Sequence, residues 1–175
     1  VAQRASQRRL ESELAGRAAD GFARVGDACS EFVAREQRHV AGRNTARLDV
    51  QIAEAHGLLR LATTTEHRGM ALEALAATLI EDFRDDEIVR CAREARDIAA
   101  ASANPIRELA AARIESRALA RMRRIDEALS LVERYLPLAQ AQIADPLGAR
   151  AVAELGCTLM TCDRVAQAAG LFELA

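Results

Sequence analysis

Three arginines at helical spacing are the residues whose type and pattern most directly suggest chemistry. Arg113, Arg117 and Arg121 recur every four residues, so on one helix their guanidinium groups stack along one face. Like charges placed in this way repel one another and call for anionic partners, and guanidinium groups bind carboxylates and phosphates in a two-pronged geometry. Two hypotheses follow. Either the stripe binds an acidic ligand, or acidic residues of the chain itself neutralise it, with these candidates: Glu73, Glu81, Glu108 and Glu115.

No other pattern of residues predicts a reactive centre. The chain contains no GxxxxGK-S/T, GxGxxG, HExxH or GxSxG sequence and no EF-hand loop, so phosphate-loop, dinucleotide, zinc-protease, esterase and calcium sites lack their starting residues. His39, His56 and His67 lie in three different predicted segments, which disfavours a histidine-ligated metal. We therefore expect no catalytic residue, no metal and no cofactor. The four cysteines show neither a CxxC spacing nor a histidine at a ligand spacing, which favours a reduced, cytoplasmic setting: Cys29, Cys91, Cys157 and Cys162.

The composition favours an all-helical fold. Of 175 residues, 50% are hydrophobic but only 3% are aromatic, so Ala, Leu, Val and Ile carry the apolar share and strand-forming residues are scarce. The 24 basic and 26 acidic residues give a net charge of -2, which disfavours direct contact with nucleic acid. All the basic residues are Arg, a bias typical of a GC-rich bacterial genome. Charged residues interrupt every apolar stretch, so no segment is expected to cross a membrane.

Helix boundaries repeat with a period of about 40 residues. Two strong helix starts, Asn104-Pro105 and Asp145-Pro146, lie 41 residues apart, and each combines a capping side chain with Pro at the first helical position. Aligning Ile88 with Ala128, and Ala128 with Ala168, gives a shift of 40 residues both times. Each period contains two helical patterns separated by a short polar turn, so the two helices of a pair must be antiparallel.

We predict a single all-α domain over residues 1–175. Residues 68–175 form three clear helix pairs, the last of them truncated, and residues 1–67 form N-terminal helices and a degenerate repeat. The chain does not begin with Met and stops within a helical pattern, so we expect a piece of a longer protein. The predicted helices cover residues 5–24, 27–40, 45–63, 68–83, 86–102, 105–122, 125–143, 146–162 and 164–175.

The last helix pair resembles the tetratricopeptide repeat (TPR). The family pattern places a large residue, Leu-Gly and a large residue on the first helix, and Ala, an aromatic residue and Ala on the second. The matching residues are Val152, Leu155, Gly156, Leu159, Val165, Ala168, Phe172 and Ala175. In the preceding pair Ser116 takes the Gly place and Tyr135 the last Ala place, and the others match: Leu119, Ile125, Ala128 and Val132. The resemblance implies a TPR-like α-solenoid, a right-handed superhelix of antiparallel helix pairs.

The resemblance also implies a binding surface. In the family the first helix of each pair lines a concave groove, and transfer of the register places the arginine stripe at groove positions. Arg150 on the next first helix would stand beside the stripe, Glu73 would lie on the previous first helix, and Met160 would belong to an apolar floor. The predicted binding residues are therefore Arg113, Arg117, Arg121, Arg150, Glu73 and Met160.

A protein-interaction or ligand-sensing module is the function that the resemblance implies. The 40-residue period exceeds the usual length of about 34, and lengthened repeats are typical of large bacterial signalling proteins, such as a sensor region fused to a diguanylate cyclase. The alternatives are the effector-binding domain of a LuxR-type transcriptional regulator and a free-standing scaffold. We expect an acidic protein or peptide partner or a small-molecule effector, and the apolar truncated end also allows a homodimer, through Leu171, Phe172 and Leu174.

Overall fold

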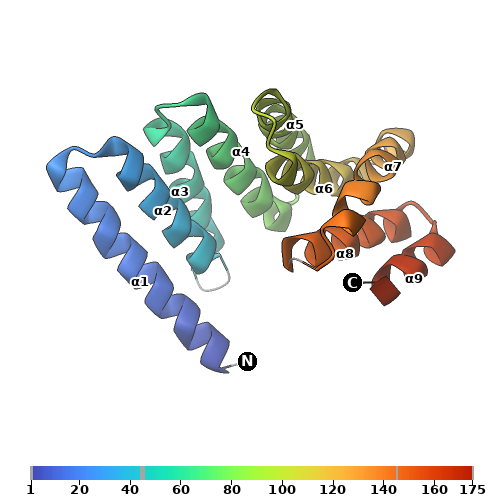
Figure 1. The fold of residues 1–175 in the computed structure, drawn as a ribbon, viewed down its shortest axis with the longest axis horizontal. Helices are drawn as coiled ribbons and strands as arrows, with labels where there is room; N and C mark the ends of the chain where they lie inside the picture. Colours follow the sequence, from blue (N-terminus) through green and yellow to red (C-terminus); the bar gives the residue numbers. More distant parts are fainter. Residues whose placement is uncertain (1, 44–45, 145, 175) are drawn as a thin grey trace. The chain divides into compact units, whose positions relative to one another are not determined.

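The regular secondary structure is helical throughout the part of the chain that the structure describes, which confirms the all-α prediction (Figure 1). The computed structural model describes the backbone of residues 2–43, 46–144 and 146–174, and the side chains of residues 6–43, 46–144 and 148–174. The helices in chain order are α1 (Ala2–Val25), α2 (Ala28–Gly42), α3 (Leu48–Leu61), α4 (Thr65–Leu79), the 3-10 turn η1 (Ile80–Asp82), α5 (Asp85–Ala101), α6 (Pro105–Arg121), α7 (Ile125–Ala141), α8 (Pro146–Thr161) and α9 (Val165–Leu174).

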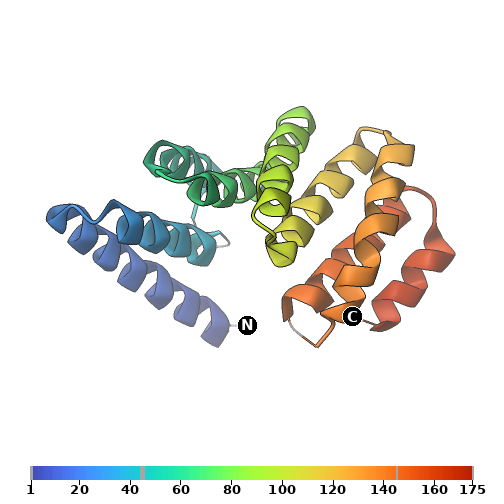
Figure 2. The same cartoon turned by 45° about the horizontal axis from the view of Figure 1, so that its top comes forward.

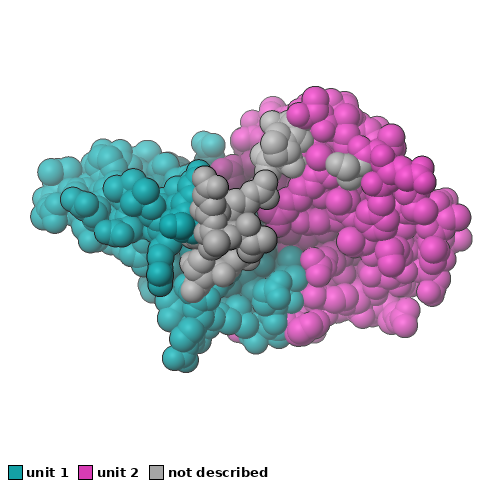
Figure 3. Space-filling view, turned by 90° about the horizontal axis from the view of Figure 1, so that it is seen from below, with its two compact units in different colours: residues 1–82 teal, residues 83–175 magenta. Residues whose placement is uncertain are grey.

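The chain divides into two compact units (Figure 3). Unit 1 comprises residues 1–82 and unit 2 residues 83–175. In unit 1, α1 packs against α2, α3 packs against α4, and α2 contacts both α3 and α4. In unit 2, α5 packs against α6, α6 against α7 and α8, and α8 against α7 and α9. Short turns make successive helices of each unit run in opposite directions (Figure 2), as the pairing argument requires.

The helix starts agree with the sequence prediction where a capping side chain marks them. Asn104 caps α6, because its side-chain oxygen accepts a hydrogen bond from the Arg107 backbone N–H at 3.1 Å, and Pro105 follows at the first helical position. The start of α4 lies three residues before the predicted one, since Thr64 caps it and accepts from the His67 N–H at 3.0 Å. The predicted cap Asp145 and the predicted start at Thr45 fall outside the described residues.

The turns after α5, α6 and α8 share one backbone geometry. Ala103, Arg123 and Asp163 have φ values of 51°, 61° and 60°, in the left-handed region that L-residues seldom adopt. The next N–H in each case reaches a carbonyl five residues earlier at 2.9 Å, which is the Schellman arrangement. The repeated turn therefore ends these three helices without the Gly that usually occupies such a position.

Small residues close the core. Much of the buried apolar surface belongs to alanines, among them Ala71, Ala112 and Ala128, and such residues let helix axes approach closely. Gly156 does the same between α8 and α9, because a Cβ atom there would lie 2.9 Å from Cε1 of Phe172. That close approach explains the Leu-Gly pair in the last repeat. Among the described residues, no helix is long and apolar enough to cross a membrane.

Candidate functional site

The three stripe arginines lie along α6 in unit 2, at the spacing that the sequence predicts. Arg113 is buried, with 8% of its surface exposed, and Arg117 and Arg121 are half-buried. Because the helix continues unbroken from Pro105 to Arg121, all three side chains leave it on the same side. Their immediate surroundings differ, and these surroundings decide what each arginine can bind.

Arg113 binds an acidic residue of the next first helix. Its guanidinium forms an ion pair with Glu154 of α8, and the same carboxylate accepts a hydrogen bond from Nε of Arg150 at 2.7 Å. Burial alone would raise the pKa of Glu154, but the two guanidinium groups outweigh it and hold that pKa below its ordinary value. One carboxylate thus serves two cations, which leaves an excess of positive charge on this face.

Arg121 is tied to the start of α5. It forms an ion pair with Asp85 in the first turn of that helix, and its guanidinium carbon lies 5.2 Å from the ring centroid of Phe83. The ring face attracts the cation, so Arg121 has both an anionic and an aromatic neighbour within unit 2. This arginine contributes to the internal network.

Arg117 differs from its two neighbours on the stripe. Within the part of the chain that the structure describes, no acidic side chain forms an ion pair with it. On α8, Cys157 is exposed and Met160 has 51% of its surface exposed. Arg117 is therefore the stripe residue with charge available for an external anion, and the neighbouring first helix offers apolar surface for the rest of a ligand.

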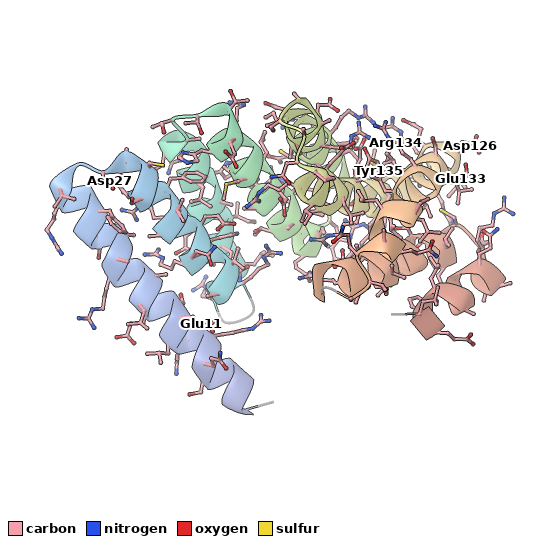
Figure 4. All side chains as sticks on the ribbon, viewed as in Figure 1. Glu11, Asp27, Asp126, Glu133, Arg134 and Tyr135 are labelled. Atoms are coloured by element: carbon pink, nitrogen blue, oxygen red, sulfur yellow. The ribbon has the colours of Figure 1, made fainter. Side chains whose placement is uncertain are left out.

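The acidic residues expected to neutralise the stripe have other places in the structure. Glu115 is 1% exposed and binds Arg93 at 2.8 Å and Arg96 at 3.2 Å. Glu108 accepts a hydrogen bond from the Tyr135 hydroxyl, and Nη2 of Arg134 lies 3.3 Å from Oε1 of the same carboxylate. Figure 4 labels Arg134 and Tyr135, both on α7. Burial and this carboxylate raise the pKa of Tyr135 to about 12.

The two other acidic residues that the sequence suggested as partners of the stripe lie in unit 1. Glu73 is half-buried on α4, and Glu81 is exposed in η1. Sequence reasoning thus missed the actual partners of the stripe, Asp85 and Glu154. The signal for one of them was present, because Glu154 follows Arg113 by 41 residues, about one repeat period.

Two further hollows lie outside the stripe. A pocket of about 310 Å³ in unit 1 is lined by α2 and α3, with Arg35, Arg38 and Arg60 around Leu58 and Leu61. A groove of about 660 Å³ in unit 2 lies between α7 and α9, with a mostly apolar lining that includes Leu129, Val132, Leu136, Leu171 and Leu174. No group of three or more metal-ligating side chains with suitable geometry occurs among the residues described.

Comparison with known proteins identifies the fold. No protein-family model matches the chain, and no curated protein matches it. Two solved structures do match, both of kinesin light chain-like TPR-like repeats from Podosopora anserina, and one is a single-substitution variant of the other. Each is 16% identical to this chain and covers 97% of it; the TM-scores are 0.62 and 0.60, over 92% and 93% of those chains. The fold is TPR-like. This similarity confirms the predicted repeat architecture.

Proposed function

We propose that the chain is a TPR-like protein-interaction module whose unit 2 binds an acidic peptide segment across α6 and α8. The observation that carries the proposal is the excess of guanidinium groups on this face. Arg113 and Arg150 share the single carboxylate of Glu154, and Arg117 has no ion pair among the described residues. An incoming carboxylate would gain a charge-assisted hydrogen bond at Arg117 without displacing an internal one.

The exposed surface of α8 suits a peptide better than a free anion. Cys157 and Met160 present apolar atoms on the next first helix, and a thioether adapts to varied apolar partners. An amphipathic acidic helix or an extended acidic segment could use both kinds of contact at once. Binding of this kind should weaken as salt concentration rises, because solvent-exposed charges are screened.

Charge reversal of the free arginine tests the proposal. The probe is a short fluorescent peptide of Glu, Leu and Ala, compared with the same peptide carrying Gln in place of Glu, and the readout is fluorescence anisotropy. Arg117→Glu should weaken binding of the acidic peptide by at least about tenfold. Circular dichroism should show unchanged helix content and a nearly unchanged melting temperature, because Arg117 makes no internal ion pair in the described structure.

The matched control is Arg90→Glu, which makes the same change in net charge. Arg90 lies on α5, and its side chain is 75% exposed. Its Nη2 makes only a long contact of 3.9 Å with Oε1 of Glu87. We expect Arg90→Glu to weaken binding by less than about twofold, since Arg90 lies on neither helix of the proposed site and an exposed charge is screened. Equal effects of the two variants, or equal affinity for the Glu and Gln peptides, would refute a site at Arg117.

The wider setting that we propose is a bacterial signalling protein in which this module is the sensor region of an output domain such as a diguanylate cyclase. The repeat period of about 40 residues and the exclusive use of Arg support this setting. A LuxR-type regulator and a free-standing scaffold are the alternatives. The gene sequence on either side of residues 1–175 decides between them: a cyclase domain, a helix-turn-helix, or neither.

A small anionic effector is a second candidate ligand, and the pocket in unit 1 favours it. Of the three arginines that line this hollow of about 310 Å³, Arg35 and Arg38 form ion pairs with Glu31 and Glu54. Arg60 forms no ion pair within the described residues and is the one that supports an anion site. Citrate, inorganic phosphate and pyrophosphate should raise the melting temperature of the protein if the pocket binds anions. Arg60→Ala should remove that increase, whereas an increase that persists in the variant would place the anion elsewhere.

We also propose a reduced, cytoplasmic setting and a homodimer through the C-terminal end. Leu174 is 56% and Phe172 40% exposed, and the groove between α7 and α9 adds apolar surface beside them. Sedimentation velocity over a range of concentrations tests the dimer. Leu174→Glu should shift the population to monomer, and a monomer at all concentrations in the parent protein would exclude the dimer.

A further inference from the structure

A cysteine and a histidine that are far apart in sequence meet in unit 1. Sγ of Cys29 lies 3.7 Å from Nε2 of His67. Cys29 is the second residue of α2 and is exposed, whereas His67 lies in the first turn of α4 with 7% of its surface exposed. The pair therefore places an accessible thiol against a buried imidazole nitrogen, which is an arrangement that can activate a nucleophile.

Two contacts position the imidazole ring, and a cap hydrogen bond fixes the backbone that carries it. It stacks on Phe32 with ring centroids 4.2 Å apart and planes inclined by 10°. Its Nδ1 lies 3.4 Å from Oγ1 of Thr63, and the backbone N–H of His67 donates to Oγ1 of Thr64 at 3.0 Å. If Nδ1 carries the proton and donates a hydrogen bond to Oγ1 of Thr63, the lone pair of Nε2 faces the Cys29 thiol.

Of the charges around the Cys29 thiol, one opposes and another favours negative charge on its sulfur. The side chain of Asp27 caps α2 and accepts a hydrogen bond from the Ser30 N–H at 3.0 Å, at the position marked in Figure 4. That carboxylate, whose pKa the hydrogen bonds to Ser30 hold below its ordinary value, opposes a second negative charge two residues away. The N-terminal end of the α2 dipole acts in the opposite direction and favours negative charge on the sulfur.

The three other cysteines lack this environment. Cys91 and Cys162 are buried, and burial raises the pKa of each thiol. Cys157 is exposed on α8 in unit 2, and all three histidines of the chain belong to unit 1. The chain thus contains its own control, an exposed thiol in a unit whose sequence contains no histidine.

We propose that Cys29 and His67 form a thiol–imidazole pair that makes Cys29 a site of reversible modification by small-molecule disulfides. Nε2 of His67 takes the proton from Sγ of Cys29, and the thiolate attacks one sulfur of the disulfide. A new S–S bond forms at Cys29 while the old one breaks, and the leaving thiolate takes the proton from His67. One mixed disulfide and one free thiol result, with no other oxidant, and an excess of thiol reverses the reaction.

The histidine and the hydroxyl that positions it have separate tests. His67→Phe keeps a flat ring against Phe32 but removes the base, and Thr63→Val removes the hydroxyl that orients the ring. Thr63 is exposed, so its substitution should leave the fold intact. The probe is an aromatic disulfide that releases a coloured thiolate, and mass spectrometry of peptides from the folded protein gives separate rates for Cys29 and Cys157 as a function of pH.

In the parent protein Cys29 should react about tenfold faster than Cys157 near neutral pH. His67→Phe should bring the rate at Cys29 to that at Cys157 and move its pH profile toward alkaline values, while the rate at Cys157 stays unchanged. Thr63→Val should shift the Cys29 profile in the same direction by a smaller amount. Cys29→Ser should abolish the fast reaction with the aromatic disulfide, and this loss would assign that reaction to Cys29.

Equal rates at Cys29 and Cys157 in the parent protein would overturn the proposal, and that result needs no variant. A Cys29 rate unaffected by His67→Phe, with helix content preserved, would also overturn it. If His67→Phe loses helix content, the comparison of Cys29 with Cys157 in the parent protein decides instead, because equal rates there would refute the proposal without any variant.

Discussion

Arg113 of α6 and Glu154 of α8 form an ion pair between residues 41 positions apart in the chain. This separation is about one repeat period, so opposite charges stand at equivalent positions of successive first helices. One turn further along α6, the Ser116 and Thr158 hydroxyls lie 3.3 Å apart and are buried. The stripe therefore helps to stack one repeat on the next, in addition to the ligand-binding role proposed for Arg117.

Removal of the Glu154 charge should destabilise unit 2. Glu154→Gln keeps the size of the side chain but leaves Arg113, whose side chain is 10% exposed, without a carboxylate. We expect a loss of about 2 kcal/mol in the free energy of unfolding, measured by urea denaturation. Because the folded-state pKa of Glu154 is lowered, its contribution is present above the unfolded pKa of 4.5 and is lost as pH falls below it.

Arg150→Gln is the control for this prediction. Arg150 binds the same carboxylate, but its side chain is 56% exposed, so the pair gains little over hydration. A loss of no more than about 0.5 kcal/mol is expected. Equal losses for the two variants would mean that burial of Arg113 does not set the strength of the interaction.

Glu115 should be more important for stability than any exposed acidic residue of unit 2. It bridges Arg93 and Arg96 of α5 from α6 and is 1% exposed. Glu115→Ala creates a cavity and leaves two cations beside it, at a cost of about 3 kcal/mol. Glu127→Ala is the comparison, since Glu127 also contacts Arg93, at 3.7 Å, but is 49% exposed. Thermal denaturation that ranks Glu127 first would contradict this interpretation.

Glycine at the left-handed turn positions should stabilise the protein. Ala103, which follows the C-cap residue Ser102 of α5, has φ of 51°, a conformation that costs an L-residue about 1 kcal/mol and costs Gly nothing. Ala103→Gly should therefore raise the free energy of unfolding by about 0.5 kcal/mol. Ala100→Gly, within the last turn of α5, should lower it by about as much. A stabilisation by both variants, or by neither, would argue against left-handed strain at Ala103.

The stability of unit 1 should fall on mild acidification because of His39. Its side chain is 1% exposed, and Nε2 lies 3.0 Å from Oγ1 of Thr78, which itself donates to the Ala74 carbonyl at 2.8 Å. Nε2 is therefore the donor. Burial, then the charge of Arg43, lower the pKa of His39, and Glu54 opposes them only in part. The stabilising contribution is complete above the unfolded pKa of 6.5 and is lost as pH falls toward the lower folded value.

Urea denaturation at a series of pH values from about 7.5 to about 5.5 measures this slope. His39→Gln keeps a hydrogen-bond donor for Thr78 but does not titrate, so its stability should change less over the interval. His56→Gln, at a half-buried position of α3, should retain the slope of the parent protein. A parent slope that His39→Gln leaves unchanged would assign the pH dependence to another group.

Local signals along the chain determined the helices. The Asn104-Pro105 start and the shift of 40 residues between Ala128 and Ala168 need only neighbouring residues or a periodic pattern. The repeat also explains Gly156, whose missing Cβ admits Phe172. The turns were placed correctly but not their geometry, because the left-handed residues Ala103, Arg123 and Asp163 include no Gly to mark them.

Only the tertiary structure decided which charged and reactive side chains meet. The sequence showed that three arginines share a helix face, but not that Glu154 and Asp85 bind two of them and leave Arg117. Likewise, Cys29 and His67 are separated by 38 residues, a distance that no local pattern relates. Helix formation depends on residues within one or two turns, whereas these pairs depend on how helices rotate and pack against one another, and that is set by the whole core at once.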